Sequence, residues 1–159
     1  MIQRLLTPDR NRRLIWMLVG LVIAFAWVAG RDGRGRDGQA CTVEQIQAGD
    51  LMAANCAVEG TVTIRLYCLD AANPSQPEGQ TSRDYLRRLA PTTVSLRPHD
   101  TDGEGRIIGE LLGHAGQSLN LALVEGGQAT VDPRSCPERR FLAAQERAQQ
   151  TGRGIWATR

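Results

Sequence analysis

The chain of 159 residues has a formal charge of +2, and all of its 19 basic residues are arginine. Seven arginines lie in residues 1–36, whereas the part from Gly38 onward carries 12 arginines and 14 acidic residues. This length allows one compact domain and a short extension. The net negative charge of the larger part excludes a protein that coats nucleic acid by bulk positive charge, so any phosphate must be recognised by a few placed arginines.

The N-terminal part of the chain differs from the rest. Residues 1–13 carry four arginines and one acid, and residues 14–30 (LIWMLVGLVIAFAWVAG) carry no charge. We expect 1–13 to be cytoplasmic and 14–30 to be a single-pass inner-membrane anchor, with the domain in the periplasm or another extracytoplasmic space. The alternative is a signal peptide cleaved near Ala24-Phe25-Ala26, which would give a secreted protein. Residues 31–39 read as a linker, which leaves 40–159 as the folded domain.

The four cysteines all follow the apolar segment and include no C-x-x-C pair. This spacing favours disulfides in an oxidising compartment over a zinc site. A predicted hairpin turn at 48–50 lies midway between Cys41 and Cys56, so these two residues would face each other across an antiparallel pair. We therefore expect a Cys41–Cys56 bond, which leaves Cys68 to pair with Cys136. The alternative is that one or both pairs stay reduced.

Strands and helices follow one another beyond the linker. The pattern predicts main strands at 41–46, 52–58, 60–69, 92–97 and 106–113, and a short strand at 128–131. It predicts helices at 83–89, capped by Thr81 and Ser82, at 119–125 and at 138–151. Five strands with helices after the third and the fifth make an α+β fold. A five-stranded Greek-key β-barrel of the OB-fold type, with about three helices, would accommodate it.

Two charged residues stand out in the stretch from Ile64 to Asn73. Arg65 lies between apolar neighbours in a predicted strand, so its guanidinium must reach a partner or a cleft. A salt bridge across the sheet is the alternative to a ligand-binding role. Asp70 follows at the end of the same strand, where an aspartate often caps local amides.

Five motifs in order resemble the staphylococcal nuclease (thermonuclease) family over residues 49–156. They are Gly49-Asp50, Ile64-Arg65-Leu66 leading to Leu69-Asp70-Ala71, Asp102 to Arg106, Leu119 to Ala129, and Gly154-Ile155-Trp156. The resemblance implies a Ca²⁺-dependent phosphodiesterase on a five-stranded barrel that acts on DNA and RNA. It also implies single-stranded or frayed nucleic acid as the partner, and we expect a monomer.

The resemblance also implies roles for individual residues. Asp50 and Asp70 match the family's metal carboxylates, and the backbone carbonyl of Ala71 matches a third ligand, all of them the oxygen donors that a hard cation prefers. Arg65 and Arg106 match the two arginines that hold the phosphate, where guanidinium groups oppose the negative charge that builds during attack. The alternatives are a turn aspartate at 50, a capping aspartate at 70 and ordinary salt bridges for the arginines.

The sequence departs from the family at the position of the general base. Asn73 stands where the family has a glutamate, and an amide has no basic site near neutral pH. Losing a general base commonly costs about 10²–10⁴-fold in rate. Glu78 in the same loop is a candidate substitute, although nothing in the sequence fixes its position. Glu104 replaces the family's tyrosine, and the loop 131–136 contains no tyrosine, where the family usually has aromatic residues that stack on a base.

These departures leave two functions open. The first is a membrane-anchored nuclease with weak or impaired hydrolysis, and the alternative is a non-catalytic module that binds nucleic acid or another partner on the same barrel. The two histidines, His99 and His114, lie in predicted turns, and we expect them to be surface residues and not catalysts.

Overall fold

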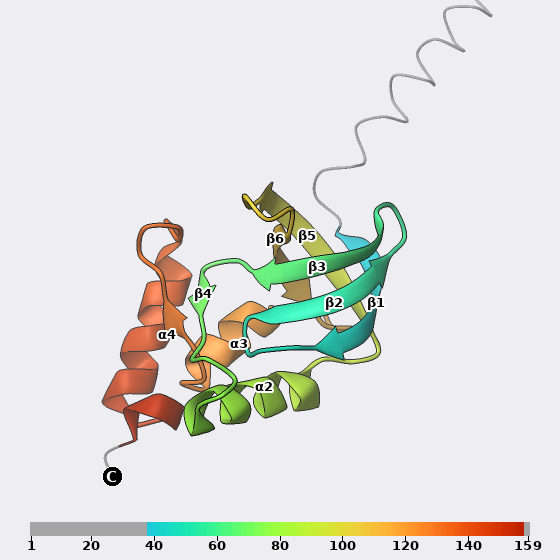
Figure 1. Ribbon diagram of the computed structural model, residues 1–159. Coiled ribbons are helices and arrows are strands. Elements are labelled where there is room, and N and C mark those ends of the chain that lie inside the picture. Colours follow the sequence, from blue (N-terminus) through green and yellow to red (C-terminus); the bar gives the residue numbers. More distant parts are fainter. Residues whose placement is uncertain (1–37, 158–159) are drawn as a thin grey trace, which may run out of the picture. The chain divides into compact units, whose positions relative to one another are not determined.

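The computed structural model describes residues 38–157 (Figure 1). The predicted cytoplasmic segment 1–13 and the predicted membrane anchor 14–30 lie outside the described residues, as does most of the predicted linker 31–39. Within the described residues, no helix is long and apolar enough to cross a membrane.

Five strands close into a barrel in the order β1-β2-β3-β6-β5, and β5 pairs back onto β1. Neighbouring strands are antiparallel except β3 and β6, which are parallel. Alternate residues of the strands face a closely packed interior, as Met52 and Ala54 do, because side chains alternate between the two faces of a strand. This barrel confirms the predicted five-stranded OB-fold-like architecture. Its strands are β1 (Gln39–Ile46), β2 (Leu51–Cys56), β3 (Gly60–Leu66), β5 (Thr93–Thr101) and β6 (Ile107–Leu112).

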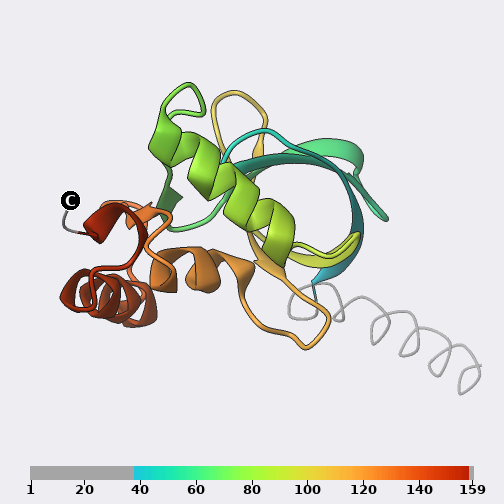
Figure 2. The same ribbon diagram turned by 90° about the horizontal axis from the view of Figure 1, so that it is seen from below.

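Three α-helices and a two-stranded sheet complete the described part. In Figure 1, α2 and α3 lie below the barrel and α4 stands beside β4; seen from below in Figure 2, α2 runs across the front of the barrel. Phe141 of α4 is fully buried in the core between these layers. The bounds are α2 (Pro77–Leu89), α3 (Leu119–Glu125), α4 (Arg139–Gln150), β4 (Leu69–Asp70), β7 (Thr130–Val131) and a short 3₁₀ helix, η2 (Gly154–Trp156).

Helix α2 begins earlier than the sequence pattern indicated. Its first residue is Pro77, and Thr81 and Ser82 lie inside the helix, so the prediction that they cap it is wrong. Proline suits the first helical position because its fixed φ is already helical and its missing N–H would have no partner there. Ser82 is fully buried, and a Cβ placed on Gly49 would lie 1.8 Å from its Oγ. The helix therefore packs directly against the turn between β1 and β2.

The predicted strand at 60–69 is broken into two. β3 ends at Leu66, and Cys68 takes a left-handed conformation with φ of 69° before β4 begins. L-residues seldom adopt this conformation, and it reverses the chain direction within a few residues. The turn brings Asp70 back toward the side chain of Arg65.

Both predicted disulfides are present. Cys41 and Cys56 lie directly opposite each other in the β1–β2 ladder and are bonded. The second bond joins Cys68, just after β3, to Cys136 in the loop before α4. It therefore ties the loop that follows β7 to the end of the strand that carries Arg65.

Strand β5 runs further than predicted and includes an irregularity. The ladder with β6 pairs Pro98 with Gly109 and Asp100 with Ile108, so His99 is an extra residue in β5. Such a bulge bends a strand and redirects the side chain at that position. The prediction that His99 lies in a turn is therefore wrong: it lies in a strand, and its ring stacks on that of Tyr67.

Candidate active site

Three charged side chains come from adjacent elements of the barrel. Asp50 leads into β2, Arg65 lies near the end of β3, and Arg106 directly precedes β6. Leu51 is paired with Arg65 in the β2–β3 ladder, and the carbonyl of Asp50 accepts a hydrogen bond of 2.8 Å from the amide of Leu66. The register of β2 on β3 therefore fixes Asp50 beside Arg65, and the charge of Arg106 also acts on Asp50.

Asp50 is partly withdrawn from water. Burial raises the pKa of its carboxyl, while a hydrogen bond from the Ala71 amide and the charge of Arg65 act in the opposite direction. The carboxylate of Asp70 is close enough to raise the pKa of Asp50 further. Arg65 Nη2 lies 3.9 Å from Asp70 Oδ1. The structure thus brings together Asp50, Arg65, Asp70 and Ala71, whose roles in metal and phosphate binding stay predictions from the resemblance.

The two carboxylates have the chemistry of a hard-cation site. Each gives oxygen ligands, their mutual repulsion would be relieved by a bound cation, and Ca²⁺ takes 6–8 oxygen ligands. Within residues 38–157 there is no group of three or more acidic, histidine or cysteine side chains arranged to hold a metal. Asp50 and Asp70 by themselves would be an incomplete donor set, and a bound cation would need further oxygen ligands.

The two arginines are held in different ways. The Arg65–Asp70 pair is long, and its side chains are 41% and 65% exposed. Arg106 makes short contacts within its own turn, from Nε to Asp102 Oδ2 at 2.6 Å and from Nη1 to Glu104 Oε2 at 3.0 Å. The hydrogen bond between Arg106 and Asp102 raises the pKa of the arginine and lowers that of the aspartate. Arg65 is therefore open to an anionic ligand, whereas Glu104 already occupies one edge of Arg106.

Asn73 is held by its own loop. Its Oδ1 accepts hydrogen bonds from the amide of Ser75 at 2.9 Å and from Ser75 Oγ at 2.8 Å, which makes an Asx-turn. Its backbone carbonyl accepts a bond of 2.9 Å from the amide of Gln76. The first turn of α2 packs so closely that a Cβ on Gly79 would lie 2.0 Å from that carbonyl oxygen. The only acceptor of the side chain is therefore already used locally.

Glu78 lies in the first turn of α2. It lines a hollow of about 250 Å³ together with Gln128, Gly154 and Ile155. Arg65 lines a different cavity. Glu78 and Arg65 therefore line different hollows, and the role of Glu78 as a substitute base stays a prediction.

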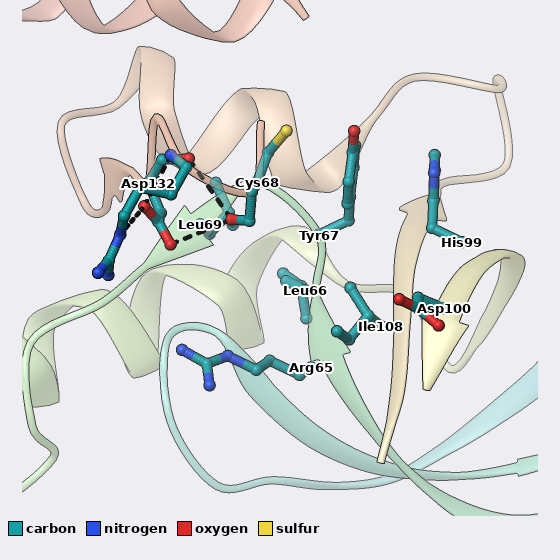
Figure 3. A pocket seen from close by; sticks show the side chains of 11 residues that line it. Arg65, Leu66, Tyr67, Cys68, Leu69, His99, Asp100, Ile108 and Asp132 are labelled. Atoms are coloured by element: carbon teal, nitrogen blue, oxygen red, sulfur yellow. Dashed lines mark hydrogen bonds and ion pairs between the residues drawn. The ribbon is translucent and has the colours of Figure 1, made fainter. Parts of the chain in front are cut away.

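A cavity of about 590 Å³ opens beside Arg65 (Figure 3). Its walls include Tyr67 just after β3, His99 from the bulge of β5, and Asp132 and Arg134 from the loop after β7. The rings of Tyr67 and His99 are stacked, with centroids 3.9 Å apart and planes 5° from parallel. In Figure 3 these rings stand parallel, with Arg65 below them and Asp132 to the left. The cavity therefore combines a guanidinium, an aromatic pair and a polar loop.

Comparison with known proteins identifies the family. The family model described as "Staphylococcal nuclease homologue" matches residues 63–158. The chain belongs to the staphylococcal nuclease family. It is 28% identical over 148 residues to an "Uncharacterized endonuclease" of Haemophilus influenzae, covering 92% of this chain and 80% of the relative. It is 32% identical over 97 residues to an "Uncharacterized endonuclease" of Escherichia coli, covering 60% and 63%. It is 30% identical over 134 residues to "Endonuclease YhcR" of Bacillus subtilis, covering 72% of this chain and 11% of that protein.

The family's motifs include one residue whose structural role the sequence alone left unassigned. Asn120 of α3 is fully buried; its Oδ1 accepts from the amide of Leu111, and its Nδ2 donates to the carbonyls of Tyr67 and Gly109. These bonds join β6 to the chain just after β3, where Tyr67 lines the cavity. In this member of the nuclease family, Asn120 therefore fixes the strand ends that present the site.

The sequence reasoning missed most of the cavity wall, including Tyr67, His99 and Arg134. Tyr67 follows Arg65 by two positions, and side chains two apart on extended chain share a face, so this residue was within reach of prediction. His99 reaches the cavity through the bulge in β5, which depends on the pairing with β6. Arg134 reaches it through the loop tied by the Cys68–Cys136 bond. Neither of these placements has a local sequence signal.

Proposed function

We propose that the protein is a membrane-anchored nuclease that hydrolyses phosphodiester bonds of DNA or RNA slowly, outside the cytoplasm and with Ca²⁺. The observation that supports it best is the partly exposed guanidinium of Arg65, which lies 3.9 Å from Asp70, interacts electrostatically with Asp50 and lines a cavity of about 590 Å³. The relatives named as endonucleases support the same class of reaction.

The charged residues of the site have different roles in the proposed reaction. Arg65 binds the phosphate and stabilises the negative charge that develops on its oxygens during attack by water. Asp50, Asp70 and the Ala71 carbonyl would hold Ca²⁺, which supplies additional positive charge at the phosphate when it is bound. Arg106 binds the phosphate only after its ion pair with Glu104 has broken.

The proposed reaction is slow because Asn73, at the position of the family's general base, cannot accept a proton from the attacking water. The acceptor oxygen of Asn73 is bound to Ser75, and an amide is not basic near neutral pH. The missing base accounts for about 10²–10⁴-fold in rate. A hydroxide ion from solvent must then replace a water activated by the enzyme.

The same observation at Asn73 supports a second candidate function. A protein that keeps its phosphate-binding arginine and loses its base is suited to bind nucleic acid without cleaving it. The second candidate is therefore a non-catalytic binding module on the same barrel.

Cleavage of a labelled oligonucleotide tests the two candidates. The full-length chain, oxidised and in mild detergent, is incubated with fluorescent single-stranded DNA in Ca²⁺ or in EDTA. The proposal expects cleavage that needs Ca²⁺ and falls by at least about 100-fold in Arg65→Ala. The matched control is Arg139→Ala, because Arg139 is an exposed arginine at the start of α4.

Two results would go against a nuclease. Cleavage equal in wild type and Arg65→Ala would point to a contaminating enzyme. DNA binding that depends on Arg65 without any Ca²⁺-dependent cleavage would favour the binding module.

The proposed location has its own test. Alkaline phosphatase fused to the C-terminus of the full-length chain gains its disulfides only outside the cytoplasm. We expect an active fusion that sediments with the membrane fraction. An inactive fusion would exclude export, and an active fusion released into the medium would indicate the cleaved alternative.

A further inference from the structure

The stacked rings of Tyr67 and His99 have no part in the phosphate chemistry described above. Tyr67 is half-buried, and its ring also meets the edge of Phe141 at a centroid distance of 6.3 Å. His99 is exposed and lies on the outer side of this stack. The arrangement is thus a column of rings anchored in the core, whose last member faces solvent at the cavity wall.

The backbone is shaped to produce this column. His99 is the extra residue of the β5 bulge, between Pro98 and Asp100, and bulges near functional sites redirect side chains. The partner ring packs against Phe141 of the core, and the backbone carbonyl of Tyr67 accepts a hydrogen bond from buried Asn120. An exposed histidine stacked 3.9 Å from a tyrosine packed on the core is therefore a placed group and not a mobile surface side chain.

The column lies next to the phosphate-binding arginine. Arg65 in β3 and Tyr67 in the turn just after that strand line the same cavity. In a nucleotide the base is joined to its phosphate through a single sugar. A phosphate held at Arg65 would therefore place its own or the adjacent base within reach of the rings.

We propose that Tyr67 and His99 form a stacking platform for one nucleobase of a single-stranded nucleic acid bound at Arg65. The proposal rests on the phosphate binding proposed above and does not require hydrolysis. Every base has a π-face, so such a platform accepts all four bases, and it favours single strands because duplex bases are already stacked. A volume of about 590 Å³ falls within the usual range for small-molecule sites. The platform would supply the aromatic contact that the tyrosine-free loop 131–136 lacks.

Binding to paired oligonucleotides tests the platform. Fluorescence anisotropy measures the Kd of the full-length protein in EDTA for single-stranded DNA and for the same backbone with abasic sites. We expect wild type to bind the base-bearing strand about tenfold more tightly, within the range for stacking on one aromatic platform. His99→Ala should lose most of this preference and bind the abasic strand as wild type does. His99→Phe should keep the preference, because it restores the ring.

The control variant is His114→Ala, the only other histidine of the chain, which is exposed in the turn after β6. Tyr67 is left unchanged because it packs against Phe141, and circular dichroism checks that each variant is folded. The proposal is overturned if wild type does not distinguish the two strands, if it binds neither, or if His99→Ala keeps the full preference. A base preference that persists in a protein with no Ca²⁺-dependent cleavage rejects the proposed hydrolysis and leaves the platform standing.

Discussion

The strands and the loop on either side of Asp70 hold their polar groups in opposite ways. On the strand side, ladder register places Asp50 beside Arg65, and within residues 38–157 the guanidinium of Arg65 makes a single long ion pair, with Asp70. On the loop side, the oxygen of Asn73 is bound to Ser75. The comparison shows that charge placement follows from the barrel itself, whereas proton transfer depends on one loop side chain that can be lost without disturbing the fold.

The largest expected effect is the loss of unfolding free energy when the Cys68–Cys136 disulfide, next to the end of β3, is removed. Cys68–Cys136 spans 68 residues and Cys41–Cys56 spans 15. Chain-entropy estimates put the loss of unfolding free energy at roughly 4 kcal/mol for Cys68→Ser with Cys136→Ser, and at roughly 3 kcal/mol for Cys41→Ser with Cys56→Ser. Urea denaturation of the oxidised proteins measures both values.

The two disulfides should differ more in their effect on the affinity for single-stranded DNA than in their effect on stability. Only the Cys68–Cys136 bond fixes the loop that carries Arg134 into the cavity. The first double variant should therefore bind single-stranded DNA more weakly at a temperature where both variants are folded. Equal affinities would mean that the loop takes no part in binding.

The second prediction restores the missing group on the loop side. Asn73→Glu should raise Ca²⁺-dependent cleavage by about 10²-fold, at the low end for a general base, because the loop must first give up its contacts with Ser75. Single-turnover cleavage of labelled DNA measures the gain. The matched control is Asn55→Glu, because Asn55 is exposed on β2. A gain equal in both variants would show an effect of net charge alone.

The third prediction concerns stability and pH on the strand side. The pKa of Asp50 is raised above its ordinary value of 3.8 by burial, so the folded protein holds the proton more tightly than the unfolded chain. The resulting stabilisation is complete below the unfolded pKa and is lost as pH rises through the folded pKa. At neutral pH, Asp50→Asn should therefore raise the unfolding free energy by on the order of 1 kcal/mol.

Thermal unfolding with and without Ca²⁺ checks this prediction. The gain from Asp50→Asn should vanish well below pH 3.8, and Glu59→Gln serves as the control because Glu59 is exposed in the turn between β2 and β3. Ca²⁺ should stabilise wild type and not Asp50→Asn, since a ligand of the folded state raises its stability. A variant less stable than wild type at neutral pH would contradict the placement of Asp50 as a desolvated carboxylate.

The barrel and both disulfides follow from the sequence because their signals are local or symmetric. The turn at 48–50 centres Cys41 on Cys56, and alternating apolar residues mark the strands. The start of α2 was misplaced because two helix-start signals compete, Pro77 and Thr81-Ser82. Burial of Ser82 against Gly49 decides between them, and that contact is tertiary.

The candidate site was predictable in its charges and not in its aromatic wall. Arg65 and Asp70 are visible in sequence as a charged pair on one strand, and Glu104 lies two positions from Arg106. The position of His99 depends on a register shift between β5 and β6, which no local pattern reveals. The hydrogen bonds of Asn73 are made with Ser75, two residues later, so they have a local sequence signal. The sequence analysis considered Asn73 only as a replacement for the general base and therefore missed them.

The smallest predicted effect tests whether Arg106, like Arg65, can bind an anionic ligand. Arg106 Nη1 lies 3.0 Å from Glu104, whose side chain is 72% exposed. Exposed ion pairs are weak, so Glu104→Gln should release this edge of Arg106 and tighten the binding of single-stranded DNA by about threefold at low salt. Fluorescence anisotropy measures the change.

The charge-matched control for this variant is Glu146→Gln, because Glu146 is exposed on α4 and far from β6 in the chain. Raising the salt concentration should shrink the difference, since salt screens exposed charges. If both variants tighten binding equally, the gain reports net charge only. If Glu104→Gln alone has an effect, and Arg106→Ala removes it, then Arg106 reaches the phosphate once its own turn releases it.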